Sequence, residues 1–166
     1  MTTYFSVSHL GHLSAKEVHQ LYKLRVDVFV AEQHCPYHEI DDVDLQASTM
    51  HIMARNGSRL VGCARMVPTT FGEFAAATGA SAEELEADTA VVQFGRLALE
   101  QDARGTGLAP DIIDQALKMA AGQFSGQPVV LAAQSGLESY YERFGFTRCG
   151  EEFDDAGTPH IPMVRR

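Results

Sequence analysis

Hydrophobic and polar positions repeat along the chain with two different periods, and each period predicts a type of secondary structure. Close to the N-terminus, the residues at helical spacing are mostly apolar: Val18, Leu21, Tyr22, Leu24, Arg25, Val28 and Phe29. This spacing predicts an amphipathic helix of roughly four turns. Ser14 stands in front of it and Glu17 follows three residues later, which is the pattern of a capping box at a helix start.

Shorter segments either alternate between apolar and polar residues or are apolar throughout, which is typical of strands. The expected strands are residues 3–8, 49–54, 60–67, 91–99, 127–133, 146–153 and 159–164. Asn56 and Gly57 separate two of them and form a strong hairpin signal. Asp155-Ala156-Gly157 is expected to turn the chain between the last two.

Helices are expected between several of these strands. Pro110 is tolerated only in the first turn of a helix, and the residues after it form one apolar stripe: Ile113, Ala116, Leu117 and Ala120. Ser81 and Ser135 are expected to cap two shorter helices, of which the second ends before Gly145. The order of elements predicts an α/β sandwich, in which a mixed sheet has helices on both faces.

Composition limits the class of protein. The 166 residues suit a single domain over residues 1–166, and 45% hydrophobic against 21% charged residues is typical of soluble globular proteins. No apolar run approaches the ~18 residues of a membrane-spanning helix. Three widely spaced cysteines fit a reducing cytoplasm, and the net charge of −9 argues against nucleic acid and favours a cationic substrate such as an amine. We therefore expect a cytoplasmic protein that binds neither nucleic acid nor membranes.

The strand that ends at Leu99 leads through a charged turn into a loop with two glycines. Gly105 and Gly107 lack side chains, and the helix that follows directs its unpaired backbone N–H groups over the loop. Such a loop is a cradle for an anion, and phosphate is its expected ligand. Leu108 stands where a P-loop requires lysine, and Pro110 stands where a dinucleotide fingerprint requires a third glycine. Both of those sites are therefore excluded.

Residues 31–44 combine acidic, histidine and cysteine side chains. A solvated acidic loop is one interpretation of this composition. His34, Cys35 and His38 would be candidates for a metal site, but no second ligand pair with matching spacing occurs, so we expect no metal.

Three separated stretches resemble the GCN5-related N-acetyltransferases, the GNAT superfamily. The first is Arg104-x-x-Gly107-x-Ala109, which resembles the family's Gln/Arg-x-x-Gly-x-Gly/Ala signature, and the second runs from Gln134 through Tyr140-Tyr141 to Gly145-Phe146. The third is Arg25-x-x-Val28-Phe29-Val30-x-Glu32-Gln33-x-Cys35-Pro36-Tyr37-x-Glu39-x-Asp41, with His51, Gly95-Arg96 and His160-Ile161-x-Met163, and it is similar to the ElaA-type branch. The resemblance covers essentially the whole chain and implies a mixed, mostly antiparallel sheet flanked by helices on both faces.

The resemblance implies an acyltransferase that moves an acetyl group from acetyl-coenzyme A to a primary amine by direct attack, without a metal. In this family the strand before the loop lends backbone groups to the pantetheine arm, which here assigns Leu97 and Leu99. The pyrophosphate would be held by Arg104, Gly105, Thr106, Gly107, Leu108 and Ala109, and Gln134 would also contact the cofactor. Tyr141 matches the family's general acid, which protonates the leaving thiolate.

A general base is needed because an alkyl ammonium with a pKa of about 10 must lose a proton before attack. The register that holds a glutamate in histone-type relatives holds Gln93 here, which cannot act as a base. The remaining candidates are Glu32, Glu39 and His51, and the sequence does not choose among them. Arg96 lies in a buried strand, so we expect it to pair with a carboxylate such as Glu39 or Asp41.

Two other functions remain open from the sequence. Arg25-x-x-Val28-Phe29, Glu39-x-Asp41-x-x-Asp44 and Arg65-Met66-x-Pro68-Thr69 also resemble the N-terminal half of acyl-homoserine-lactone synthases. That family lacks the Arg-Gly-x-Gly loop and normally contains tryptophan, which this chain does not. A non-catalytic coenzyme A-binding module is the third interpretation. For an enzyme, the expected partner is a small-molecule or peptide amine. The sequence leaves open which amine this is, whether longer acyl groups are accepted, and whether the chain forms a homodimer.

Overall fold

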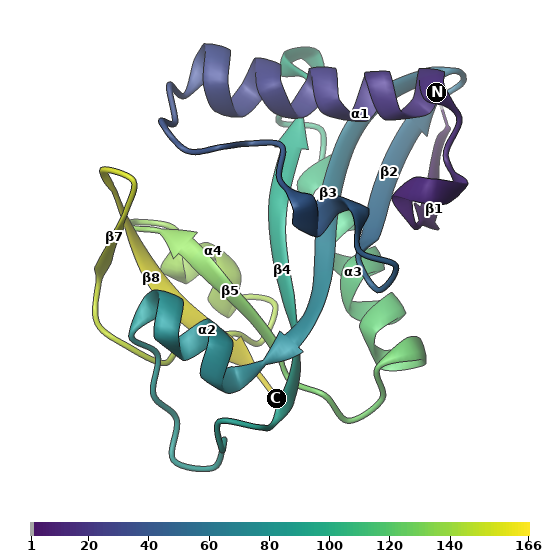
Figure 1. The fold of residues 1–166 in the computed structure, drawn as a ribbon. Helices are drawn as coiled ribbons and strands as arrows, with labels where there is room; N and C mark the ends of the chain where they lie inside the picture. Colours follow the sequence, from purple (N-terminus) through teal and green to yellow (C-terminus); the bar gives the residue numbers. More distant parts are fainter. Residues whose placement is uncertain (1) are drawn as a thin grey trace. The chain divides into compact units, whose positions relative to one another are not determined.

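The computed structural model describes residues 2–166 and shows helices alternating with strands (Figure 1). The strands are β1 (Thr3–Ser8), β2 (Met50–Asn56), β3 (Arg59–Thr70), β4 (Ala90–Leu99), β5 (Val129–Gln134), β6 (Thr147–Arg148), β7 (Phe153–Asp155) and β8 (Thr158–Arg165). The α-helices are α1 (Ala15–Val26), α2 (Phe71–Thr78), α3 (Leu108–Gln123) and α4 (Glu138–Glu142). A π-helical turn, Asp27–Glu32, continues α1.

The strands form a mixed sheet in the order β1-β2-β3-β4-β5-β8-β6, and β7 pairs with β8. Strands β4 and β5 are parallel, whereas the β1–β2, β2–β3, β5–β8, β6–β8 and β7–β8 pairs are antiparallel. The mixed, mostly antiparallel sheet is therefore confirmed. Within residues 2–166, every helix is too short or too polar to cross a bilayer.

The chain divides into two units. The first comprises the residues up to Val67 together with Gly95–Met119, and the second comprises Pro68–Phe94 and Ala120–Arg166. Strands β3 and β4 each contribute residues to both units. The single domain expected over residues 1–166 stays a prediction.

In the first unit, α1 packs on one face of β2 and β3. Its capping box forms as the sequence predicts, because the Ser14 hydroxyl accepts from the Glu17 N–H at 3.2 Å and the Glu17 carboxylate accepts from the Ser14 N–H at 3.0 Å. The buried residues of this face are Leu10, Leu21, Leu24, Val28, Phe29, Cys35, Met53, Leu60, Cys63 and Ala98. This core fixes both α1 and the segment that follows it.

Helix α3 covers the opposite face of the same strands (Figure 1). A Cβ atom on Gly62 in β3 would lie 2.7 Å from Ile112 Cδ1 and 3.2 Å from Leu108 Cδ2. Glycine at this position lets the first turns of α3 approach β3 closely. The helices of this unit therefore lie on both faces of the sheet, and the start of α3 is held against β3.

The second unit contains the first half of β4, strands β5 to β8, and helices α2 and α4. Val92 and Gln93 of β4 lie opposite Val129 and Val130 of β5, and β5 pairs along its whole length with β8. The core of this unit consists of Phe71, Phe74, Ala80, Val91, Val130, Cys149 and Val164.

The helix expected after Ser81 is wrong in position. Helix α2 begins earlier, because the Thr70 hydroxyl accepts from the Glu73 N–H at 3.2 Å and caps it. Gly79, with a φ of 75°, ends the helix in the left-handed conformation. Ser81 lies beyond that end, and its N–H donates to the Cys149 carbonyl at 2.7 Å. Residues 81–89 therefore contain turns and irregular backbone in place of a helix.

The Ser135 cap is also wrong. Its hydroxyl donates to a carboxylate oxygen of Glu152 at 2.7 Å instead of capping a helix. Gly136 has a φ of 100°, which is incompatible with a helical turn, so α4 begins only at Glu138. The stop at Gly145 is confirmed, since this residue leaves the helix with a φ of 91°.

The strand expected over residues 146–153 is divided into β6 and β7. Arg148 pairs with Met163, and Phe153 pairs with His160. The four residues 149–152 therefore face only the two residues 161–162 of β8. The extra residues cannot stay in register with β8 and leave the ladder.

Candidate active site

A groove of about 610 Å³ lies beside the loop that joins β4 to α3 in the first unit. Its apolar part includes Leu24, Val28 and Leu99, and its charged part includes Glu32, Asp102 and Arg104. The loop that the sequence singles out therefore borders a hollow with apolar and charged walls, as ligand sites commonly have.

Gly105 and Gly107 both have left-handed backbone, with φ of 74° and 86°. A Cβ atom on either glycine would meet no other atom within 4 Å, so the space in front of the loop is open. Within residues 2–166, the backbone N–H groups of Gly105 and Gly107 donate to no backbone carbonyl. The loop thus presents N–H groups beside open space at a helix start, which is what an anion requires.

The remaining residues of the loop are held in place by packing and hydrogen bonds. Leu108 is buried and contacts β3 near Gly62. The Thr106 hydroxyl donates to the Ala103 carbonyl at 2.5 Å. Asp111 lies in the first turn of α3, where its charge favours the helix start. The packing of Leu108 and the hydrogen bond of Thr106 thus tie two positions of the loop to their neighbours.

Arg104 turns back from the loop onto Glu32 and the end of β4. Its two terminal nitrogens donate to the two carboxylate oxygens of Glu32 at 2.8 and 3.1 Å, and Nη2 also donates to the Leu99 carbonyl at 3.0 Å. Arg104, with Gln101, lowers the pKa of Glu32. The structure thus brings one base candidate together with two predicted cofactor-binding residues, and makes Glu32 a weaker base.

The first-unit half of β4 carries Leu97 and Leu99, the residues expected along the pantetheine arm. Arg96, directly before Leu97, has a φ of 54°, which is rare for any residue other than glycine. This conformation interrupts the regular pleat of β4, as strained residues and bulges often do beside functional sites.

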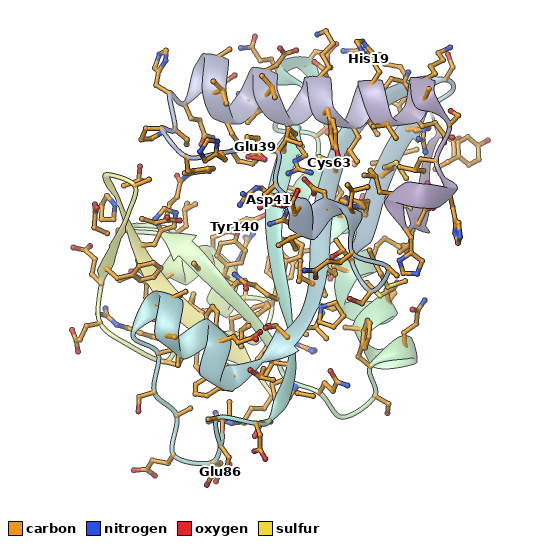
Figure 2. The ribbon with its side chains drawn as sticks, in the orientation of Figure 1. His19, Glu39, Asp41, Cys63, Glu86 and Tyr140 are labelled. Atoms are coloured by element: carbon orange, nitrogen blue, oxygen red, sulfur yellow. The ribbon has the colours of Figure 1, made fainter. Side chains whose placement is uncertain are left out.

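An arginine–carboxylate cluster lies in the same unit and consists of Arg25, Arg65, Arg96, Glu39, Asp41 and Asp44. Figure 2 shows Glu39 and Asp41 in the segment that follows α1. Nε of Arg25 and Nε of Arg96 both donate to Glu39 Oε2, at 3.0 and 2.9 Å. The expected pairing of Arg96 is therefore confirmed.

The centre of this cluster is buried. Arg25 and Asp44 have 1% and 0% of their surface exposed, and Arg25 Nη1 donates to Asp44 Oδ1 at 2.7 Å. Burial alone would raise the pKa of Asp44, but the guanidiniums of Arg25 and Arg65 lower it. Both oxygens of Asp44 accept hydrogen bonds from other residues of the protein, so the carboxylate is satisfied without a ligand.

Glu39 differs from Asp44 in this respect. Burial raises the pKa of its carboxyl, although Arg96 and Arg25 act in the opposite direction. Its Oε1 is buried and has no hydrogen-bond partner among residues 2–166. The ring of Tyr37 lies on the Arg96 guanidinium, 5.2 Å from ring centre to carbon. Glu39 is therefore a base candidate with one oxygen that the protein leaves unused.

His51, the third base candidate, is buried in β2. Its Nε2 lies 3.2 Å from the Asp44 carbonyl, a bond that needs the ring proton on Nε2. Burial lowers the pKa of the imidazole, so the ring is neutral at pH 7. His51 supports the segment that carries Asp44, and its role as a base stays a prediction.

Tyr141 and Gln134 lie in the second unit. Tyr141 is in α4, where its ring packs edge-on against Tyr140 and Phe146. Burial raises the pKa of Tyr141 to about 12, so the phenol keeps its proton at pH 7, as a general acid must. Gln134 ends β5 opposite His160 of β8. The roles expected for Tyr141 and Gln134 stay predictions.

No group of three or more histidine, cysteine or acidic side chains in the described part of the chain is arranged to hold a metal ion. Cys35, Cys63 and Cys149 are buried free thiols. His34 and His38 are exposed.

Arg25, Asp44 and Arg65 belong to the cluster, and in the sequence they stand out only within the stretches that resemble known families. One signal is present in the sequence, because Arg25 falls on the apolar stripe of the predicted helix. A charged residue on a buried helix face requires buried partners. The π-helical turn after α1 has no comparable signal in the pattern.

Residues 13–166 match the family model described as the acetyltransferase (GNAT) domain. Protein ElaA of Escherichia coli (strain K12) is 32% identical over 157 residues, which are 95% of this chain and 92% of that protein. The crystal structure of Escherichia coli ElaA has a TM-score of 0.82 and covers 99% of this chain and 100% of its own.

Two further structures are similar. An acyl-CoA N-acyltransferase from Pseudomonas aeruginosa has a TM-score of 0.84 at 32% identity, covering 99% of this chain and 100% of its own. The coenzyme A-dependent acyl-homoserine lactone synthase BjaI, with SAM and isopentyl-CoA, has a TM-score of 0.77 at 20% identity, covering 98% and 82%. At that identity the likeness to BjaI shows a shared fold alone.

Proposed function

Since the chain belongs to the GNAT acetyltransferase family, we propose that it transfers the acetyl group of acetyl-coenzyme A to a primary amine by direct attack. Family membership and the acyl-CoA N-acyltransferase fold support an acyltransferase that uses a coenzyme A thioester. The acetyl donor, the amine acceptor and the mechanism are the proposal.

The observation that carries the proposal is the open, glycine-lined loop at the start of α3. Both glycines are left-handed, and the space that their side chains would fill is empty. This cradle fits the pyrophosphate of coenzyme A, which would be held by the backbone of residues 104–109 and by Arg104. Since Arg104 is already paired with Glu32, the ligand's phosphate would compete with that carboxylate for the guanidinium.

The arm of the donor would run along the first-unit half of β4, beside Leu97 and Leu99. A bound thioester supplies an activated carbonyl and a leaving thiol with a pKa of about 8.5. Backbone N–H groups of β4 would stabilise the negative charge that develops on the carbonyl oxygen. Gln134 is proposed as a further contact of the cofactor.

Proton transfer is divided between two kinds of residue. Tyr141 is proposed to protonate the leaving thiolate, and its raised pKa keeps the phenol protonated for this step. No enzyme nucleophile is needed, because a neutral amine attacks a thioester directly. The base would be one of Glu32, Glu39 and His51.

A second candidate function is that of an acyl-homoserine-lactone synthase. It is favoured by the arginine–carboxylate cluster, which brings together Arg25, Glu39, Asp41, Asp44 and Arg65, the residues that carry that resemblance. The Gly105–Gly107 cradle favours the acetyltransferase. A coenzyme A-binding module without activity would retain the cradle and transfer nothing.

Release of free thiol tests the three functions together. We expect thiol release from acetyl-coenzyme A with at least one member of a panel of polyamines, amino acids, peptides and arylamines. Thiol release from an acylated acyl-carrier protein, but not from acetyl-coenzyme A, would instead identify the synthase. Tight binding of acetyl-coenzyme A without release on any amine would identify the binding module. The cytoplasmic location, the small-molecule or peptide acceptor and a homodimer stay predictions.

A further inference from the structure

We infer that the Arg104–Glu32 ion pair is a latch, which opens when a phosphate group at the Gly105–Gly107 loop takes Arg104 from Glu32 and so loosens residues 30–34. This inference rests on the proposed function, because it takes the pyrophosphate of the donor as the ligand of the loop. It adds to that function a conformational response to donor binding in the chain that follows α1.

The latch joins the loop to the last residue of the π-helical turn. Nη1 of Arg104 donates to Glu32 Oε2 at 2.8 Å, and Nη2 donates to Glu32 Oε1 at 3.1 Å. The side-chain amide of Gln101 also donates to Glu32 Oε1, at 3.1 Å. The carboxylate thus holds the guanidinium through two parallel bonds, as a phosphate group would. The Arg104 and Glu32 side chains are 39% and 34% exposed, so an anion from solvent can reach the pair.

Arg104 is also anchored at the loop independently of Glu32. Its Nε and Nη2 both donate to the Leu99 carbonyl, at 3.3 and 3.0 Å. The residue directly precedes Gly105, whose left-handed backbone belongs to the cradle. A diphosphate held by the N–H groups of the loop therefore competes for Arg104 from a fixed position close by, which gives it a high effective concentration. The guanidinium can exchange one anion for the other without leaving the loop.

Residues 30–34 are the part of the chain that Glu32 secures. All five are exposed, whereas Phe29 and Cys35 on either side are buried. His34 has a φ of 55°, a left-handed conformation that is uncommon for residues with a side chain. Exposed stretches with few buried side chains open locally at little cost in free energy. Loss of the ion pair therefore loosens these five residues while their buried neighbours stay in place.

The coupling acts in both directions. If donor binding breaks the pair, the pair weakens donor binding by the same factor. For an ion pair this exposed, that factor is at most about fivefold. The latch therefore does not prevent the donor from binding. It converts donor binding into a local opening of the chain that leads to the arginine–carboxylate cluster.

Hydrogen exchange of the backbone amides tests the inference. The N–H groups of Gln33 and His34 report on the segment, because each donates to a carbonyl of the π-helical turn. In the unmodified protein, we expect saturating acetyl-coenzyme A to slow exchange at residues 105–108 and to speed exchange at residues 30–34 about threefold or more. Unchanged or slower exchange at residues 30–34, with residues 105–108 protected, would overturn the inference.

Two variants distinguish the latch from a general loosening of the loop. Glu32→Gln removes the charge that holds Arg104, so residues 30–34 should exchange fast without a ligand and show no further increase with acetyl-coenzyme A. The matched control is Arg59→Gln, which breaks another two-bond pair on the same loop, with Asp102 at 2.9 Å for both bonds. The control should retain the response of residues 30–34 to the donor. Loss of that response in Arg59→Gln, or its persistence in Glu32→Gln, would overturn the inference.

Inorganic pyrophosphate identifies which part of the donor opens the latch. We expect it to speed exchange at residues 30–34 as acetyl-coenzyme A does, because it carries the same diphosphate. A response to acetyl-coenzyme A alone would assign the opening to the rest of the donor and overturn the inference.

Calorimetry and thiol release separate this inference from the proposed function. If acetyl-coenzyme A does not bind, the proposed function fails and the latch fails with it. If acetyl-coenzyme A binds and thiol is released, but residues 30–34 do not respond, the latch alone is wrong and the acetyltransferase remains.

Discussion

Arg104 holds both carboxylate oxygens of Glu32, at 2.8 and 3.1 Å, across 72 positions of sequence. The pair joins the loop before α3 to the π-helical turn after α1. Glu32 therefore occupies the guanidinium that the proposal assigns to a phosphate of the donor. Under the proposed function, we therefore expect Glu32 to affect donor binding more than proton transfer.

Substitutions in this pair should separate the two roles. We expect Arg104→Ala to raise the KM for acetyl-coenzyme A about tenfold, because one charge-assisted contact to phosphate is lost. Glu32→Gln should lower that KM or leave it unchanged, because it removes a competitor for Arg104. Steady-state kinetics with varied acetyl-coenzyme A measure both effects. A fall of 100-fold or more in kcat for Glu32→Gln would restore Glu32 as the base.

Gly107→Ala should weaken donor binding. The φ of 86° strains any residue with a side chain, and the added methyl group would enter the open space of the cradle. We expect a loss of about 1 kcal/mol in the free energy of unfolding, with a KM for acetyl-coenzyme A raised at least tenfold. The control is Gly57→Ala, at a φ of 61° in the hairpin turn and also without neighbours. It should lose similar stability at an unchanged KM, and equal KM values in the two variants would argue against the cradle.

Tyr141→Phe should lower kcat about 100-fold without weakening acetyl-coenzyme A binding, because only the proton donor is removed. The pKa of about 12 also predicts that the unmodified enzyme loses no activity to ionisation of this phenol up to pH 10. Tyr140→Phe is the matched control, since the two rings are neighbours with centres 5.3 Å apart. Similar kcat values for the two variants would remove Tyr141 from the proposed role.

His51 should make stability depend on pH. Burial lowers its pKa in the folded chain, so the unfolded chain binds the proton first as pH falls through about 6.5. The contribution of His51 to the free energy of unfolding is therefore fully present above about pH 6.5 and is lost as the pH falls below that value. We expect urea unfolding between pH 7 and 5 to show a steeper loss for the unmodified protein than for His51→Gln, by up to about 1.4 kcal/mol per pH unit. Identical slopes would contradict a buried neutral imidazole.

Two cationic residues of α1 should differ strongly in their contribution to stability. Arg25→Met removes the buried cation that Asp44 and Glu39 share and leaves them with Arg65 and Arg96 respectively, so we expect a loss of about 3–5 kcal/mol in the free energy of unfolding. Lys23→Met breaks an exposed pair with Asp27 and should cost less than about 1 kcal/mol. Urea denaturation at pH 7 measures both. Equal losses would show that the cluster contributes no more than a surface ion pair.

Local signals in the sequence predict the parts of the fold that depend on neighbouring residues. The Ser14–Glu17 capping box, the Asn56-Gly57 turn and the stop at Gly145 all form where their residue types indicate. The same logic fails at Ser81 and Ser135, because Thr70 caps an earlier helix and Gly136 prevents a helical turn. Several residues in each stretch have side chains that can cap a helix, and tertiary packing determines which of them does so.

The candidate site follows the same division. The glycine loop can be read from a few consecutive residues, because its chemistry lies in the backbone of one turn. The cluster cannot, since it joins α1 to residues 14 and 19 positions further on and to β3 and β4. Which carboxylate accepts which guanidinium, and which oxygen remains unpartnered, depends on distances that spacing does not encode.

The π-helical turn Asp27–Glu32 has one more consequence. The Gln33 N–H donates to the Val28 carbonyl at 3.0 Å, so this turn holds one residue more than an α-helical turn would. Deleting Val30 would let α1 continue regularly and would rotate the following chain by roughly 100° about the helix axis. The extra residue thus sets the direction in which the chain leaves α1 and the position of the segment that contains Glu39. We expect deletion of one residue here to disrupt this segment more than insertion of several residues in the exposed hairpin turn.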